Sequence, residues 1–554
     1  MILMVTLFAY YIFDYIRKLW IYGNWENKLQ VILVSVFFVL LLALLLYLFI
    51  CSSLYYKWTK RNFVFDRFIR KDRPDETFPL LLLAHKEYQE NQKYRIQTSK
   101  TEKGQTEQKT GIIFGKLDNG EYYTSPEMEE GNIACFGFQG TGKTTGILIP
   151  TLLNWRGRVF CIDISGDISA TVKRPKQYTY RPDEGVGVYD VFFDVKRAPD
   201  KDSRLEHISR IAQLLIPDNP NANENSKYFS DNGRKMLNAA LIYYYKKGYE
   251  FGDMCLEIVK QSAIELLQTV SGDEDIIDDI LPLISSFNGA NEKNTQGCKE
   301  SVDAVLKFFA TNARVRRTLR SIDIEKKERG VAPFLLEVFD MFICIPQEKL
   351  SIYQPLLRLM VGQMFNYYVG RKLDSKMVIL FALDEFGRFG NINGIVDALG
   401  TLRKRKVRVM LLTQNVSDID AVYGQYMRDS ILGNCTFTVC LGAKDIQTQR
   451  YFSELAGEHY KTRYGVNTGE KGSRFTIAEE RGNIIEPASL AYLHEEKKVL
   501  LLAPQGYIPL NKLLWFQDKR MCEQVKRLKL RHQEQLKKRQ MKGNMKNGNT
   551  QRRN

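Results

Sequence analysis

The chain has 554 residues, of which 44% are hydrophobic, 26% charged and 12% aromatic. This composition excludes a wholly disordered chain, and the length allows roughly three to five domains. The nine cysteines form no CxxC pair and their number is odd, which excludes a small disulfide scaffold and argues against a zinc site; we interpret them as reduced core residues. The net charge of +16 is concentrated in residues 57–73 and 519–554, so the body between them is close to neutral.

The N-terminal region carries two apolar segments. Residues 31–50 contain no charged side chain, and a helix of that length spans about 30 Å, the thickness of one hydrocarbon core. Residues 1–16 are interpreted as a second, shorter span, with an amphipathic segment lying on the membrane as the alternative. Because the basic stretch 57–73 follows, the positive-inside rule places the rest of the chain in the cytoplasm. The sequence therefore predicts a multi-pass cell-membrane anchor over 1–56 and a basic linker over 57–110.

A phosphate-binding motif follows a short apolar, strand-like run at 133–136. Residues 137–144 (GFQGTGKT) match GxxxxGK[ST], and a stretch of helical character follows at 145–153. Such a loop points backbone N–H groups at phosphate oxygens, while Lys143 reaches the β- and γ-phosphates and Thr144 offers its hydroxyl to Mg²⁺. Pro150 is expected to kink the helix. The residues predicted to bind ATP are Gly137, Gly140, Thr141, Gly142, Lys143, Thr144 and Thr145.

A second apolar run, at 377–383, ends in the acid pair Asp384 and Glu385. The carboxyl end of a buried strand is where a phosphate-loop enzyme holds its metal and polarises the attacking water. Asp384 is therefore the predicted Mg²⁺ ligand and Glu385 the predicted catalytic carboxylate. A turn-capping acid pair on a core strand is the alternative.

Further strand-like runs alternate with helical stretches, which is typical of a parallel sheet with helices on both faces. These runs cover residues 159–162, 407–412, 436–441 and 498–503. Gln414 ends the second run, which we expect to lie next to the acid strand. Its side chain could contact the γ-phosphate or the attacking water, or be only a polar strand terminus. Arg403, Arg405 and Arg408 precede Gln414 in the chain; one of them could reach a neighbouring subunit's site, or the run could be a solvated helix face.

The interval between Asp163 and Asp384 is far longer than a simple crossover requires. Helical stretches are predicted in it at 205–216, 234–245, 258–267, 276–284 and 302–309, with a polar loop at 218–227. We therefore predict a mostly helical domain over 205–335, inserted into an α/β domain formed by 111–204 and 336–518. Residues 519–554 are predicted to be a basic tail, helical early and disordered at its end, that contacts phosphate backbones or serves as a solubilising or membrane-surface segment.

Together these features resemble the type IV secretion coupling proteins of conjugation, the TraG/TraD family, and most closely those of Gram-positive mobile elements. The resemblance is carried by the anchor, GFQGTGKTT, LDEFGRFGNINGIVDALGTLRKRKVRVMLLTQN and LGAKDIQTQRYFSELAG. It implies a RecA-like P-loop ATPase domain with an inserted all-α domain, preceded by a transmembrane helical anchor. The stretch 163–167 departs from the family pattern because it lacks the lysine often found there.

The resemblance also implies roles for individual residues. Lys143, Glu385 and Gln414 would act in ATP hydrolysis, Arg403 would act on the site of a neighbouring subunit, and Mg²⁺ would be held by Thr144 and Asp384. The implied partners are single-stranded DNA with its relaxase, components of the secretion channel, the membrane and further copies of the chain in a homo-hexamer.

The expected function is a membrane-anchored, DNA-stimulated ATPase that delivers a relaxase-bound single DNA strand to a type IV secretion channel. One alternative is a nucleotide-regulated receptor that recruits protein substrates, in which the helical domain carries the function. Another is a duplex DNA translocase, which a C-terminal winged-helix domain would favour; residues 519–554 are too few to form one.

Overall fold

The structure, a computed structural model, describes residues 17–18, 21, 97–100, 106–109, 111–125, 131–164, 166–218, 222–469, 472–504 and 506–534. The chain divides into two units, Met1–Thr77 and Phe78–Asn554, and nearly all described residues belong to the second. Both predicted membrane segments lie outside the described residues. Within the described ranges, no helix has both the length and the apolar composition needed to cross a bilayer.

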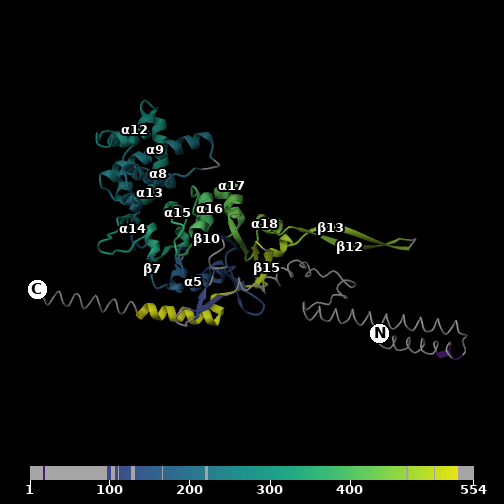
Figure 1. Cartoon of the computed structure of the whole chain (residues 1–554). Coiled ribbons are helices and arrows are strands. Elements are labelled where there is room, and N and C mark those ends of the chain that lie inside the picture. Colours follow the sequence, from purple (N-terminus) through teal and green to yellow (C-terminus); the bar gives the residue numbers. More distant parts are fainter. Residues whose placement is uncertain are drawn as a thin grey trace. The chain divides into compact units, whose positions relative to one another are not determined.

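An eleven-stranded sheet organises the described part of the second unit (Figure 1), in the order β4-β3-β15-β14-β11-β5-β10-β9-β6-β8-β7. The strands are β3 (Ile113–Lys116), β4 (Tyr122–Thr124), β5 (Asn132–Phe136), β6 (Arg158–Ile164), β7 (Gln177–Tyr180), β8 (Asp340–Ile345), β9 (Ile379–Leu383), β10 (Val407–Thr413), β11 (Cys435–Cys440), β14 (Lys498–Ala503) and β15 (Gly506–Asn511). From β11 to β7 neighbouring strands run parallel, whereas β14, β15, β3 and β4 pair antiparallel.

The central strands are buried on both faces. Along β5, Ala134 and Phe136 enter one apolar core while Ile133 and Cys135 enter another, as the period of two of a strand requires. The continuous apolar runs of β5, β9 and β10 follow from this two-sided burial. The eight cysteines that the structure describes are free thiols.

The prediction that every strand-like run belongs to a parallel sheet is wrong for β14. This strand pairs antiparallel with β11, with Cys440 opposite Leu500 and Thr438 opposite Leu502. After β11 the chain forms α18 (Ile446–Ala456) and then returns to the place where β11 ends. A hydrogen bond from the N–H of Ala443, just after β11, to the carbonyl of Leu490, shortly before β14, marks this return. A strand that starts at that edge must run in the opposite direction.

Between β7 and β8 the described chain forms helices and no strand of the main sheet. The helices are α7 (Phe193–Arg197), α8 (Lys201–Leu215), α9 (Glu224–Lys246), α10 (Phe251–Lys260), α11 (Ala263–Ser271), α12 (Ile277–Ile284), α13 (Glu292–Thr311) and α14 (Ala313–Thr318). The predicted helix 258–267 is divided in two, because Ser262 and Glu265 form a capping box that begins α11. The predicted polar loop ends early, because the side chain of Asn223 caps α9.

A buried cation joins this helical insertion to the sheet domain. Arg358, on α15 (Gln354–Val369), donates its Nε to the carbonyl of Leu214 at 2.8 Å and a second nitrogen to the carbonyl of Leu215 at 2.5 Å. These carbonyls end α8 and have no acceptor role within the helix. Burial lowers the pKa of Arg358 to about 10, which leaves it charged at neutral pH.

The remaining helices of the sheet domain are α5 (Ile149–Asn154), α6 (Asp167–Val172), α16 (Ile395–Leu402) and α17 (Val416–Gly433). Two further pairs of strands stand outside the main sheet: β1 (Gln97–Lys100) with β2 (Thr106–Lys109), and the long hairpin of β12 (Glu458–Gly469) and β13 (Gly472–Asn483) seen in Figure 1.

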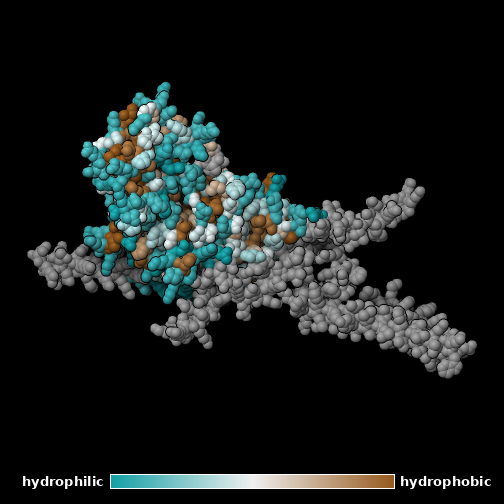
Figure 2. Space-filling view, turned by 45° about the horizontal axis from the view of Figure 1, so that its top comes forward, coloured by the Kyte–Doolittle hydropathy of each residue, from teal (hydrophilic) through white to brown (hydrophobic). Residues whose placement is uncertain are grey.

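The beginning of the predicted basic tail is helical. Residues 519–534 form a helix that buries Met521 and Val525 in the core that contains Ile133, while its lysines and arginines stay exposed. Figure 2 shows a mainly hydrophilic surface on which apolar residues gather only in small patches. Scattered apolar residues of this kind are normal on protein surfaces.

Candidate nucleotide-binding site

The phosphate-binding motif forms a loop between β5 and a short π-helix, η2 (Lys143–Leu148), which continues as α5. Gly140 and Gly142 have φ angles of 86° and 93°, the left-handed region in which only glycine is unstrained. A Cβ atom at Gly140 would meet nothing within 4 Å, so the loop borders open space there.

Pro150 was expected to kink the helix, but the helix continues through this position. The N–H of Ile149 bonds to the carbonyl of Thr144, which is π-helical spacing, and Pro150 then lies in the first turn of α5. A proline is tolerated in that position because its missing N–H needs no acceptor. The change from π- to α-helical winding accommodates the proline and lets the helix continue.

Lys143 brings the loop and the acid strand together. Its side chain is 6% exposed, and Nζ donates to the carbonyl of Gly137 at 2.6 Å. The same Nζ lies 3.9 Å from Oε1 of Glu385. A buried cation is therefore held between the loop and the end of β9, with open space at Gly140 beside it.

Asp384 and Thr144 form an oxygen pair at the start of η2. Thr144 Oγ1 donates to Asp384 Oδ2 at 3.3 Å, and Asp384 is 5% exposed. Burial, followed by the charge of Glu385, raises the pKa of Asp384 to about 7, while Lys143 opposes the shift. A hydroxyl and a carboxylate side by side are the hard oxygen ligands that suit Mg²⁺.

Gln414 directly follows β10, which lies between β5 and β9. Its Nε2 donates to Oε2 of Glu385 at 3.1 Å. Glu385 therefore has one carboxylate oxygen facing Lys143 and the other bonded to Gln414. The adjacency of the acid strand and the glutamine strand, predicted from the sequence, is confirmed.

Arg403 lies away from these residues. It begins η7 (Arg403–Arg405), which precedes β10, whereas Gln414 follows that strand. Seven strand residues separate the two edges of the sheet by about 23 Å. Among the three arginines of this stretch, Arg403 is exposed, Arg405 donates to the carbonyl of Arg371, and Arg408 is buried. The structure does not bring Arg403 into its own chain's site.

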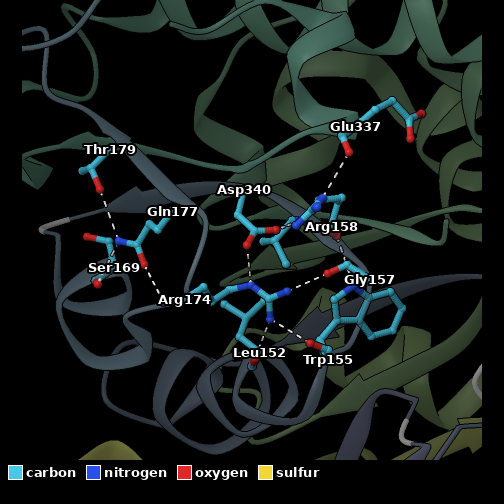
Figure 3. A network of polar contacts seen from close by, with 11 residues as sticks. Leu152, Trp155, Gly157, Arg158, Ser169, Arg174, Gln177, Thr179, Glu337 and Asp340 are labelled. Atoms are coloured by element: carbon cyan, nitrogen blue, oxygen red, sulfur yellow. Dashed lines mark hydrogen bonds and ion pairs between the residues drawn. The ribbon is translucent and has the colours of Figure 1, made fainter. Parts of the chain in front are cut away.

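Arg174 supports the phosphate-loop helix and has no sequence motif that marks it. Its guanidinium donates Nε to Asp340 at 2.9 Å, and Figure 3 shows it reaching three carbonyl groups at the end of α5 and just beyond. These carbonyls belong to Leu152, Trp155 and Gly157, at 3.1, 2.7 and 2.6 Å. Arg174 thus ties the end of the helix that begins at the phosphate loop to β8.

In the strand order β5-β10-β9, one strand separates the strand before the phosphate loop from the strand that ends in the acid pair. This order, the phosphate loop and the acid pair together define a RecA-like P-loop nucleotide-binding protein. Residues 82–542 match the family model described as "Type IV secretory system Conjugative DNA transfer". The chain therefore belongs to that family of type IV secretion coupling proteins, as the sequence predicts. The narrower assignment to Gram-positive elements stays a prediction.

Individual relatives are distant. Protein VirD4 of Rhizobium rhizogenes is 22% identical over 436 residues, which cover 74% of this chain and 62% of that protein. The conjugal transfer protein TraG of Agrobacterium fabrum is 22% identical over 411 residues, covering 70% and 61%. This chain thus spans less than two thirds of the length of these relatives.

Solved structures share the fold. The unbound conjugative coupling protein TrwBdeltaN70 aligns with a TM-score of 0.53 and 18% identity, over 73% of this chain and 88% of that chain. TrwB in complex with a non-hydrolysable ATP analogue aligns with a TM-score of 0.53 and 18% identity, over 73% and 89%.

Proposed function

We propose that the protein is a membrane-anchored ATPase that couples a relaxase-bound single DNA strand to a type IV secretion channel during conjugative transfer. The observation that carries the proposal is Glu385, held between Lys143 and Gln414 in a chain of the conjugative DNA-transfer family. The apolar segment 31–50 would supply the anchor, and the cytoplasmic body would contain the ATP site.

ATP with Mg²⁺ fits the residues present. Solved TrwB complexes contain an ATP analogue, or ADP with Mg²⁺. In this chain the left-handed glycines and backbone N–H groups of 137–145 would hold the phosphates, and Thr144 with Asp384 would hold Mg²⁺. Bound Mg²⁺–ATP supplies the transferable phosphoryl group and a divalent charge.

The other residues would act as follows. Lys143 places a buried positive charge at the phosphates, where it stabilises developing negative charge. Glu385 would accept a proton from the attacking water, and the N–H of Gln414 would fix the direction of its carboxylate. Because Gln414 directly follows β10, the strand between the loop strand and the acid strand, it is placed to transmit a change at Glu385 into the sheet.

Arg403 would complete the site of a neighbouring subunit. It is exposed and lies at the sheet edge opposite its own loop, so only another copy could place it near phosphates. An arginine delivered in this way stabilises transition-state charge. This placement supports a ring of like subunits, for which we propose the homo-hexamer.

The test is ATP hydrolysis by the full-length chain in detergent, with and without single-stranded DNA at one fixed low salt concentration, because the electrostatic part of DNA binding falls steeply with salt. We expect hydrolysis that rises with DNA. Lys143→Ala should abolish nucleotide binding and hydrolysis. Glu385→Gln should bind ATP but hydrolyse it roughly 10²- to 10⁴-fold more slowly. Exposed Glu454, on α18, provides the control variant Glu454→Gln, which should hydrolyse ATP normally.

Hydrolysis that is indifferent to DNA would contradict the motor and favour a nucleotide-regulated receptor. Conjugative transfer at normal frequency by cells carrying Lys143→Ala would also contradict it.

A further inference from the structure

Residues 513–516 (LLWF), which follow β15, pack against the phosphate-binding loop. A Cβ atom at Gly142 would lie 3.2 Å from Leu514 Cδ2, and one at Gly146 would lie 2.7 Å from the carbonyl oxygen of Leu513. Both glycines therefore permit a close approach that a larger residue would prevent. The loop and this segment form one contiguous surface.

The segment is fixed at both ends. Leu513 is 2% exposed in the core. Asp518, just beyond the segment, receives the hydroxyl of Tyr122 at 2.8 Å and the ammonium of Lys116 at 2.6 Å. Its carboxylate also accepts the N–H of Met521, in the first turn of the C-terminal helix. A segment held in this way presents its side chains in a defined position.

Two aromatic rings of this segment keep exposed surface beside the loop. Trp515 is partly exposed and Phe516 is 50% exposed, and their rings meet edge to face with centroids 5.9 Å apart. The loop's own aromatic residue, Phe138, is already covered. Lys444 Nζ lies 4.3 Å from its ring centroid, and the His494 ring packs against its edge at 5.8 Å.

The direction of a bound nucleotide follows from the loop. The β- and γ-phosphates face Lys143, and the α-phosphate faces backbone N–H groups of the first helical turn, so sugar and base extend beyond that turn. Thr145 Oγ1 lies 3.4 Å from the Cβ position of Gly142 that Leu514 also approaches. Thr145 and Leu514 therefore border the same side of the loop, the side on which the base would leave it.

We propose that Leu514, Trp515 and Phe516 form an apolar platform on which the base of the nucleotide stacks. The inference rests on the proposed function, because it names the base subsite of the same ATP site. Between them the three side chains offer a single hydrogen-bonding group, the indole N–H of Trp515. Stacking recognises the π-face that all bases share, so we expect ATP and GTP to bind within a few-fold of each other.

Equilibrium binding to the full-length chain in detergent with Mg²⁺ tests the platform. Labelled ATP, GTP and inorganic tripolyphosphate are the probes, since tripolyphosphate has neither sugar nor base. Trp515→Ala should weaken ATP and GTP binding roughly tenfold. Tripolyphosphate binding should not change. Phe516→Ala should show a smaller loss of the same kind, and Trp515→Phe should restore most of the affinity. Tyr426 on α17 is 85% exposed, and Tyr426→Ala is the matched control.

Three outcomes would overturn the platform. Equal losses of ATP and tripolyphosphate affinity would show that Trp515 only supports the loop. Unchanged ATP affinity in both alanine variants would show that the base lies elsewhere, and a wild-type preference for ATP over GTP beyond roughly tenfold would contradict recognition by stacking. Trp515→Phe and Phe516→Ala keep the test informative if Trp515→Ala does not fold.

The platform and the proposed function can fail separately. A wild-type chain that binds no nucleotide would contradict the proposed function itself. Normal DNA-stimulated hydrolysis by the wild-type chain, together with unchanged ATP binding by Trp515→Ala, would contradict the platform alone.

Discussion

At the scale of single residues, Glu385 has the most constrained position in the site. Its φ angle of 57° lies in the left-handed region that non-glycine residues seldom adopt. This conformation costs of order 1 kcal/mol and persists where surrounding contacts determine it. Here the contacts include the ammonium of Lys143 at one carboxylate oxygen, and the amide of Gln414 and the guanidinium of Arg388 at the other. The strain coincides with the residue that the proposed chemistry requires to be fixed in direction.

Asp194, away from the ATP site, allows a pH-dependence prediction. Burial raises its pKa to about 6, against an opposing effect of Arg197. An acid whose pKa is raised by folding destabilises the native state above its ordinary pKa of about 4, and the full cost is reached above pH 6. Asp194→Asn should therefore raise the free energy of unfolding by up to about 3 kcal/mol at pH 8. The gain should shrink as the pH falls through 6 and disappear below about 4, where Asp194 is protonated in both states.

Urea unfolding of the full-length chain at a series of pH values measures this difference. Asp374 is exposed, and Asp374→Asn should leave stability unchanged at every pH. A stabilising effect of Asp194→Asn that stays constant from pH 8 to pH 4 would exclude ionisation as its cause.

At the scale of elements, the network of Arg174 joins α5 to β6 and β8. Asp340 is 1% exposed and also accepts the N–H of Val159, so one buried carboxylate links the guanidinium to two strands. Arg174→Leu leaves this carboxylate without its cation and three carbonyl groups without a donor. We expect it to destabilise the protein by about 3–5 kcal/mol. It should also weaken ATP binding, because α5 continues directly from the phosphate loop.

Exposed Arg156, in the same turn, provides the matched control Arg156→Leu. Urea unfolding of both variants measures what the network contributes to stability. ATP binding by both variants measures what it contributes to the phosphate loop. Equal stability of the two variants would show that the contacts in Figure 3 contribute little.

Elements with a strong local pattern could be predicted from the sequence. The strands that carry the loop, Glu385 and Gln414 are continuous apolar runs, because they are buried on both faces. Their chemistry follows at the carboxyl ends, so the motif residues and their neighbours in the sheet were predictable. β7 and β15 were missed: their partly exposed, polar sequences QYTY and GYIPLN lack that pattern. The short strands β3 and β4 were also missed, and so was β8, although its sequence DMFICI is buried throughout. The direction of β14 and the Arg174–Asp340 pair depend on chain segments brought together only by the fold.

At the scale of the whole molecule, the roles proposed for Lys143 and Arg403 require more than one chain. The two residues lie at opposite edges of the same sheet, about 23 Å apart along β10. In the proposed ring, a complete site would combine Lys143 of one subunit with Arg403 of the next. Lys143→Ala and Arg403→Ala should each abolish hydrolysis as separate preparations, although each leaves one half of the site intact.

Mixing the two inactive variants should therefore restore hydrolysis. In a ring with random order, roughly one interface in four pairs an intact Lys143 with an intact Arg403, so an equal mixture should recover up to about a quarter of wild-type turnover. The assay is DNA-stimulated hydrolysis after the tagged variants are co-purified, which proves that they share a ring. The double variant, mixed with either single variant, is the control and should recover nothing, because no interface then contains both intact residues. Co-purifying single variants that stay inactive would show that Arg403 does not act across subunits.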